Sequence, residues 1–456
     1  MDSRRPFIFP VFVVLMAFVV VVPVFASVSA SMTPAEILFA DTPGHFTLSP
    51  DGGNLVYIRS VGTDLLPPKD NGTLVNIDVR SGVEAALTGP ALSVTSYAFS
   101  PDGNTIVYSA MPRSGGNASL YQTHVHETSA IRLPGTTDEL ITGGFTFLGT
   151  DRLAFLGAPV GTGADPGNRI AYAADEPPTP VILKTYSLKD GTISVLSANR
   201  DVITIWQASP DGHYVLYKAA PNPTSWQTGA LFRYILLDTR TGEEHLLFTS
   251  FEGYQDTNQF AWSPDSMVVY IERFENGGLR YPVEDVSFLQ VYTPATGILE
   301  DVPLGWDRGL LIDLFNADIE VNPFNGGAYL LLADGTNPKT AFLARNGTGW
   351  NITILSGKDQ GNIFAIESDR TGRTIIYNRN SASSPPQLFR ADVQDSTIRN
   401  PVELTDLNPR LLAQDLGTSE VVTWKGAWND TITGIVRYPA GYVEGKDYPL
   451  LLVIHG

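Results

Sequence analysis

The stretch "FTLSPDGGNLVYI", from Phe46 to Ile58, decides the fold of this chain. Its first residues alternate between apolar and polar, as in a strand that is buried on one face. The Ser-Pro-Asp-Gly run at 49–52 is a turn signal, because proline presets φ, aspartate caps the turn and glycine accepts a positive φ. A second run of β-branched and aromatic residues follows the turn. The stretch therefore predicts a β-hairpin.

The same pattern recurs along the whole chain. Six further copies, some with weaker turns, begin at Tyr97, Phe145, Trp206, Phe260, Ile319 and Ile366. The copies lie roughly 50 residues apart, and each continues into another apolar run and another turn, which gives about four short strands per unit. A four-stranded unit repeated seven times, with almost no helical periodicity, is typical of a β-propeller. An array of β-sandwiches is the alternative. We predict an all-β fold with a seven-bladed β-propeller over residues 45–400.

The first thirty residues differ from the rest. Arg4 and Arg5 precede an apolar run from Pro6 to Ala26, and the small residues of "VFASVSAS" follow. This layout predicts a secretory signal peptide in residues 1–30 and a secreted, extracellular protein. A membrane signal anchor is the alternative, because the run is about as long as a minimal membrane span. The Thr-Pro-Ala-Glu run at 33–36 resembles a capping box, so we expect a short helix, with "AEILFAD" as its body, in the segment 31–44.

The composition excludes some kinds of catalysis and argues against some kinds of binding partner. The chain has no cysteine, so disulfides and thiolate catalysis are excluded. A net charge of −18 without a basic cluster beyond the leader makes nucleic acid and anionic lipid poor partners. The sequence suggests no cofactor. Five Asn-x-Ser/Thr sequons are candidate glycosylation sites in a secreted chain, at Asn71, Asn117, Asn346, Asn351 and Asn429.

Three other groups of side chains could carry chemistry. His124 and His126 share a strand face, but no third ligand is evident, so we favour a solvated face over a metal site. We interpret the Glu-Glu pair at 243–244 as the exposed start of a strand. Arg308, in a Trp-Asp-Arg run, could bind a substrate carboxylate through two parallel hydrogen bonds, although a salt bridge between blades is the favoured alternative.

The pattern changes after the repeats, in residues 401–456. Two strands around a turn and a loop lead to "YPLLLVIHG" at 448–456. An uninterrupted apolar run such as Leu450–Ile454 is typical of a strand buried on both faces in an α/β sheet. Nothing follows this strand to cover it, so we expect the sequence to be incomplete.

A Ser-Pro-Asp-Gly propeller followed by "YPLLLVIHG" resembles the prolyl oligopeptidase family of serine peptidases, nearest to the acylaminoacyl-peptidase and dipeptidyl-peptidase V branch. The resemblance implies that the propeller precedes an α/β-hydrolase domain with a Ser-Asp-His triad, of which 401–456 holds the first strands. Roughly 200 further residues would complete it. No Gly-x-Ser-x-Gly pattern occurs in the chain, so we expect the triad beyond Gly456 and no catalytic residue within the chain. By resemblance, His455 and Gly456 begin the oxyanion-hole loop; an ordinary glycine turn is the alternative.

The resemblance implies a secreted serine peptidase acting on short peptides, with the propeller limiting access to the active site. The chain alone should be inactive, and its own missing hydrolase domain is the expected partner, with no membrane contact after signal cleavage. A stand-alone propeller that binds a partner without catalysis is the alternative. A third hypothesis, a glycosidase or lactonase with its site in the central channel, needs converging carboxylates that the sequence does not reveal.

Overall fold

The computed structural model describes residues 33, 40–61, 72–136, 139–159, 181–197, 199, 201–221, 231–251, 259–275, 286–311, 321–347, 349–381 and 383–453. Several sequence predictions fall outside these residues. They are the signal peptide in 1–30, most of the helix predicted in 31–44, the sequon at Asn71, and the oxyanion-loop residues His455 and Gly456.

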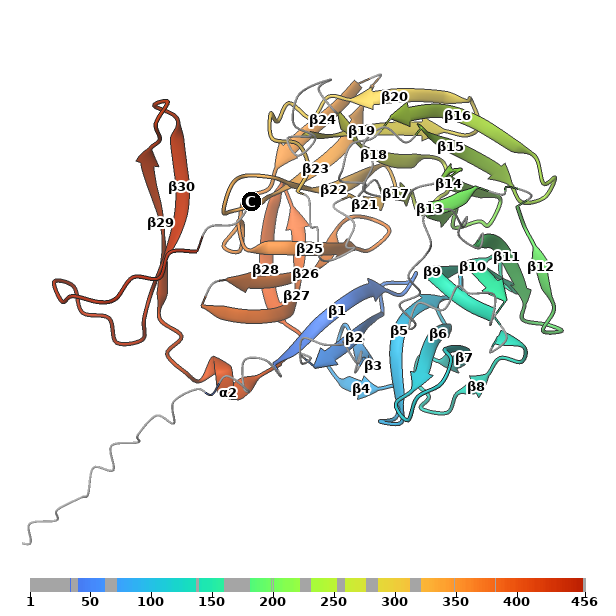
Figure 1. Ribbon diagram of the computed structural model, residues 1–456, viewed down its shortest axis with the longest axis horizontal. Helices are drawn as coiled ribbons and strands as arrows, with labels where there is room; N and C mark the ends of the chain where they lie inside the picture. Colours follow the sequence, from blue (N-terminus) through green and yellow to red (C-terminus); the bar gives the residue numbers. More distant parts are fainter. Residues whose placement is uncertain are drawn as a thin grey trace, which may run out of the picture.

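The described strands form seven four-stranded antiparallel sheets, which are arranged as blades around a ring (Figure 1). Each blade consists of four strands that are consecutive in the sequence and lie side by side in that order. The fold is a seven-bladed β-propeller, as the repeats predict.

The strand bounds follow, blade by blade. Blade 1 contains β1 (Asp41–Leu48), β2 (Asn54–Val61), β3 (Thr73–Asp78) and β4 (Glu84–Ala86). Blade 2 contains β5 (Leu92–Phe99), β6 (Thr105–Pro112), β7 (Ser119–His124) and β8 (Ile131–Arg132). Blade 3 contains β9 (Glu139–Leu148), β10 (Arg152–Pro159), β11 (Ile182–Ser187) and β12 (Ile193–Val195). Blade 4 contains β13 (Val202–Ala208), β14 (Tyr214–Ala220), β15 (Leu231–Asp238) and β16 (Glu244–Phe251). Blade 5 contains β17 (Phe260–Trp262), β18 (Val269–Glu275), β19 (Val286–Thr293) and β20 (Ile298–Val302). Blade 6 contains β21 (Val321–Phe324), β22 (Gly327–Leu332), β23 (Lys339–Asn346) and β24 (Gly349–Ile354). Blade 7 contains β25 (Ile363–Ser368), β26 (Thr374–Ser381), β27 (Ser384–Gln394) and β28 (Thr397–Glu403).

The Ser-Pro-Asp-Gly turns hold the first two strands of a blade together. In blade 1 the Ser49 hydroxyl donates to Asp51 Oδ1 over 2.5 Å, and the Asn54 amide donates to Ser49 Oγ over 2.9 Å. Gly52 has a φ of 73°, a conformation that glycine adopts without steric cost. The same serine–aspartate bond recurs at 100–102, 209–211 and 263–265. Because these bonds join residues close in sequence, the turn folds in the same way in these four blades.

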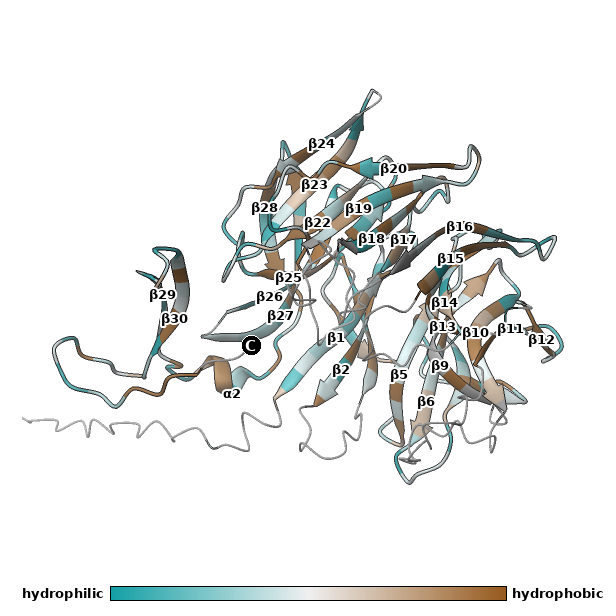
Figure 2. Ribbon diagram, turned by 45° about the horizontal axis from the view of Figure 1, so that its top comes forward, coloured by the Kyte–Doolittle hydropathy of each residue, from teal (hydrophilic) through white to brown (hydrophobic). Residues whose placement is uncertain are grey.

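The hydrophobic core lies between the blades rather than in one central mass. Seven apolar clusters each join two neighbouring blades, including blade 7 to blade 1, and the strands of the ring carry most of the apolar colouring in Figure 2. The second strand of six blades contributes a fully buried tyrosine: Tyr57, Tyr108, Tyr217, Tyr270, Tyr329 and Tyr377. Both faces of these strands are covered, which explains their nearly continuous apolar sequences.

The propeller is slightly longer than predicted. Its strands run from Asp41 to Glu403, against the predicted range 45–400. Asp41, the last residue of the predicted helix body, pairs with Val61 as the first residue of β1, so the predicted helix does not reach this position. Tertiary contacts to Asn408 and Arg59 hold Asp41 in the strand.

The segment after the ring forms a separate hairpin. A short helix, α2 (Pro409–Leu412), leads to β29 (Thr418–Lys425) and β30 (Thr431–Tyr438), which stand beside the ring in Figure 1. The third strand predicted at Leu450–Ile454 is wrong for residues 450–453, which are not in a strand, since no described strand lies beside them to pair with. Their side chains are 72–85% exposed, so this apolar run is not covered by the described part of the chain. Among the described residues, no helix is both long and apolar enough to cross a membrane.

Candidate functional site

The two ends of the ring differ in the connections that they carry. Successive strands of a blade are antiparallel, so the Ser-Pro-Asp-Gly turns lie at one end, which we call the turn end. Connections from second to third strands and from blade to blade lie at the opposite end, the loop end. β1 begins and β28 ends at the loop end, so the segment that follows the propeller leaves the ring there.

Arg308 lies at the loop end, in the connection between blades 5 and 6. Its Nη1 atom is 3.2 Å from Asp334 Oδ1, and Lys339 Nζ is 3.3 Å from the other oxygen of the same carboxylate. The neighbouring Trp306 donates its indole N–H to the carbonyl of Ala333 over 2.7 Å. Arg308 is thus ion-paired, and the pair joins the connection between blades 5 and 6 to the β22–β23 connection of blade 6. The Arg308 side chain is still 62% exposed, so part of its guanidinium faces solvent at the end of the ring where the tail leaves.

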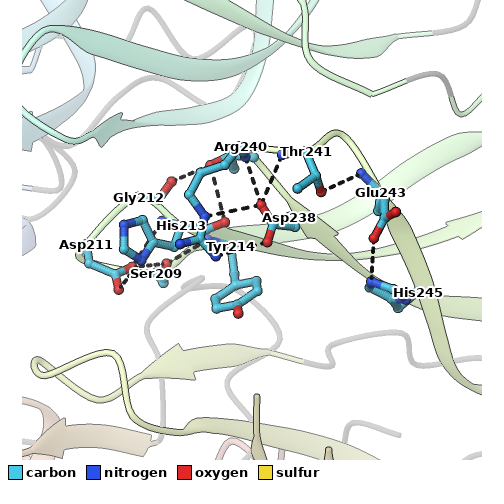
Figure 3. A network of polar contacts seen from close by, with 11 residues as sticks. Ser209, Asp211, Gly212, His213, Tyr214, Asp238, Arg240, Thr241, Glu243 and His245 are labelled. Atoms are coloured by element: carbon cyan, nitrogen blue, oxygen red, sulfur yellow. Dashed lines mark hydrogen bonds and ion pairs between the residues drawn. The ribbon is translucent and has the colours of Figure 1, made fainter. Parts of the chain in front are cut away.

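A serine, a histidine and an aspartate meet in blade 4, at the turn end (Figure 3). Ser209 donates its hydroxyl to Asp211 Oδ1 over 2.6 Å, and His213 Nδ1 lies 3.1 Å from Asp211 Oδ2. A catalytic serine needs the histidine as its hydrogen-bond partner, but here the serine hydroxyl is bonded to the carboxylate. Ser209 is also buried, and the same serine–aspartate bond occurs in blades without a histidine. This group is a turn, not a nucleophile.

The remaining contacts in Figure 3 continue to β16. Asp238 accepts hydrogen bonds from the Arg240 side chain and from two backbone amides, and the Arg240 side-chain bond lowers the pKa of Asp238 to about 2. Glu243 and His245 are exposed, and His245 Nε2 lies 3.8 Å from Glu243 Oε2. Glu244 begins β16, as predicted for an exposed strand start, and its carboxylate accepts a hydrogen bond from Ser197 in the connection between blades 3 and 4. These contacts connect turns and blades.

The other predicted positions are dispersed over the ring and the tail. His124 and His126 are exposed at the end of β7, and no group of three or more metal-binding side chains occurs within the described part of the chain. The four described sequon asparagines, Asn117, Asn346, Asn351 and Asn429, are all exposed. Asn351 donates its side-chain amide to the hydroxyl of Thr353, the third residue of its sequon, over 3.2 Å.

Comparison with known proteins identifies the fold. No protein-family model matches the chain, and no curated protein matches it in sequence. Among solved structures, Pyrococcus horikoshii acylaminoacyl peptidase is similar with a TM-score of 0.63 at 16% identity, over 91% of this chain and 60% of that chain. A puromycin-hydrolyzing peptidase of Mycobacterium tuberculosis is similar with a TM-score of 0.59 at 11% identity, over 89% of this chain and 60% of that chain. The β-propeller domain of the Trilobed protease from Pyrococcus furiosus, described as having an open velcro topology, is similar with a TM-score of 0.54 at 12% identity. The match covers 82% of this chain and 98% of that domain.

These identities establish a shared propeller fold and no more. The chain spans 60% of the length of the two peptidases and almost the whole of the isolated propeller domain. The propeller therefore resembles those of peptidases.

Proposed function

We propose that this chain is the propeller part of a secreted serine peptidase that hydrolyses short peptides, of the dipeptidyl- or acylaminoacyl-peptidase type. The observation that carries the proposal is the combination of a peptidase-like propeller with an uncovered apolar segment leaving its loop end. In the proposed protein, an α/β-hydrolase domain supplies the Ser-Asp-His triad and the chain itself is inactive.

The hairpin β29–β30 supports a further domain. Val421 and Ile435 are paired on one face, and Trp424 and Ile432 are paired on the other, and all four are exposed. A two-stranded hairpin is marginally stable in water unless its apolar residues pack against something. Apolar residues on both faces suit a sheet that is covered on both sides, as in an α/β domain.

The propeller would then act as a filter over the active site. The hydrolase domain would sit at the loop end, where the tail leaves and where Arg308 has a partly exposed guanidinium. Such a guanidinium can bind the terminal carboxylate of a short peptide. His455 and Gly456 would begin the oxyanion-hole loop in this arrangement.

Secretion and glycosylation belong to the same proposal. The leader in residues 1–30 would direct the chain to the secretory pathway, and the exposure of Asn117, Asn346, Asn351 and Asn429 would allow glycans there. Treating the protein secreted from eukaryotic cells with a peptide N-glycosidase should lower its mass. A secreted protein with unchanged mass would contradict glycosylation, and a protein retained in the cell would contradict secretion.

A binding module without catalysis is the second candidate, because all seven blades are complete within this chain. The test is the intact, deglycosylated mass of the native protein, together with labelling by a fluorophosphonate probe for active-site serines. We expect a mass well above that of this chain, labelling of the native protein, and no labelling or peptide hydrolysis by residues 31–456 alone. A native protein that ends at Gly456 and is not labelled would favour the binding module.

A further inference from the structure

Ring propellers must join their first and last blades, and this one does so without sharing strands. Within the described residues, the sheet of blade 1 contains only β1–β4, and that of blade 7 contains only β25–β28. An apolar cluster that includes Phe46 of β1 and Leu388 of β27 fills the seam between these blades. Every other pair of neighbours has a similar cluster and is also joined by continuous chain. The seam therefore needs an additional connection.

Asn408 provides that connection. The backbone N–H of Asp41 donates to Asn408 Oδ1 over 2.7 Å, and Asn408 Nδ2 donates to the backbone carbonyl of Asp41 over 2.7 Å. These residues are 367 positions apart in the sequence. A residue of a neighbouring antiparallel strand makes the same pair of bonds, so the side-chain amide takes the place of a paired strand. The Arg59 side chain holds the carboxylate of Asp41 within blade 1.

The segment around Asn408 is fixed to blade 7. We call residues 404–411 the closing strap. The Gln387 side chain of β27 donates to the carbonyl of Leu407 over 2.6 Å and accepts from its amide over 3.0 Å. Leu404 is part of the seam cluster, and Leu407 and Leu411 are buried. Asn408 has a left-handed backbone, with φ 59° and ψ 48°, at the start of α2. The closing strap thus belongs to blade 7, and the Asn408 side chain bonds it to blade 1.

We propose that the closing strap is a latch, and that its release from Asp41 and the opening of the seam between blades 1 and 7 are one cooperative event. The inference does not depend on the peptidase proposal. In this proposal the strap and the apolar cluster close the seam together, and the strap also carries the chain from the ring toward the hairpin β29–β30. The latch consequently couples the seam to the segment that follows the propeller.

Hydrogen exchange on the full chain tests the latch. Asn408→Gly removes the amide and keeps the left-handed backbone accessible. Asn400→Gly is a matched control, because Asn400 also has a positive φ, of 52°, and its side chain reaches Asp392 in its own blade. Loss of two hydrogen bonds should speed amide exchange in 41–48 and 404–411 by about 10-fold or more. Blade 4 should be unchanged. Equal effects of the two variants, or faster exchange in all blades, would overturn the proposal.

An engineered disulfide across the seam, at the turn end of the ring, tests whether opening of the seam and release of the strap are coupled. A Cβ atom at Gly52 would lie 3.6 Å from Asp369 Cβ, a separation that suits a disulfide, and the chain has no cysteine of its own. In the pair Gly52→Cys and Asp369→Cys, oxidation should slow exchange in 404–411 relative to the reduced form of the same protein. It should also suppress the effect of Asn408→Gly. Slower exchange in β1 with no change in the strap would refute the coupling. The reduced pair is the reference, because it carries the same backbone strain at position 52, where φ is 73°.

Discussion

The hydroxyl of Tyr377 lies 2.6 Å from the carboxylate of Asp359 and donates a hydrogen bond to it. Asp359 is only 4% exposed, and Arg379 Nη1 donates to its other oxygen over 3.1 Å. Asp359 precedes β25, whereas Tyr377 and Arg379 belong to β26. The contact therefore fixes the chain where it passes from blade 6 into blade 7.

Removal of the Tyr377 hydroxyl should destabilise the propeller. In Tyr377→Phe one oxygen of the buried Asp359 carboxylate loses its donor, which should cost about 1–3 kcal/mol. The midpoint of urea unfolding measures the loss. Tyr108→Phe is the control, since Tyr108 occupies the equivalent strand position in blade 2 and stacks on Tyr121 with ring centres 5.4 Å apart. Equal losses in the two variants would show that the Asp359 contact contributes nothing specific.

The buried tyrosines should resist ionisation until the propeller unfolds. Burial raises the pKa of Tyr108 to about 12, and burial is also the chief cause of raised pKa values at Tyr57, Tyr217, Tyr270, Tyr329 and Tyr377. An unfolded tyrosine titrates near about 10. These raised values therefore contribute stability that is present below about pH 10 and is lost as the pH rises through the folded values.

A titration that follows tyrosinate absorbance and circular dichroism together checks this expectation. Exposed tyrosines should ionise first, and the buried set should ionise together with loss of the β-sheet signal. If all tyrosines ionised near pH 10 while the β-sheet signal remained native, the burial of this set would be wrong.

The blades could be predicted because their defining interactions are local. Each Ser-Pro-Asp-Gly turn is held by bonds such as those from Ser49 to Asp51 and from Asn54 to Ser49, all within six residues of sequence. A period-two pattern beside such a turn leaves few alternatives to a hairpin. Even the unit starting at Phe145, which lacks the Ser-Pro-Asp run, forms the hairpin β9–β10.

The features that sequence patterns missed depend on distant partners. No local pattern marks Asn408, because its role is set by Asp41 at the far end of the ring. Asp41 itself follows helix-like residues and is drawn into β1 by tertiary contacts. The run Leu450–Val453 indicates a need for burial but not the strand that would pair with it, so its predicted strand does not form. The sequence could mark Arg308 as a candidate residue for binding a substrate carboxylate, but it could not predict that Arg308 pairs with Asp334.

Arg240 should control the acidity of Asp238. The pKa of Asp238 is lowered to about 2, first by the Arg240 side chain, whereas the pKa of Asp78 in the equivalent turn of blade 1 is lowered first by the Ser81 backbone amide. Arg240→Gln should therefore raise the pKa of Asp238, and Arg80→Gln should leave that of Asp78 nearly unchanged. Titration of the carboxyl carbons by NMR measures both. Equal shifts would refute the assigned cause.

The sign of the pH effect follows from the lowered pKa of Asp238. An unfolded aspartate has a pKa of about 3.9, so the contribution of Asp238 to stability is present above that pH and is lost as the pH falls toward about 2. Arg240→Gln should reduce this dependence. The effect should be small, because the Arg240 side chain is 54% exposed and solvent screens the pair.

The apolar tail should drive self-association of residues 31–456. Leu450 and Leu451 are each 85% exposed, and Leu452 and Val453 continue the run. Burial of one such side chain is worth about 1.5–3 kcal/mol, so several in a row can join two molecules. Leu451→Asp should lower light scattering at high protein concentration severalfold. Val402→Asp is the control, because Val402 is 52% exposed on the outer strand of blade 7 and belongs to the ring rather than to the tail. If both variants lowered scattering equally, the blade edges rather than the tail would be the associating surface.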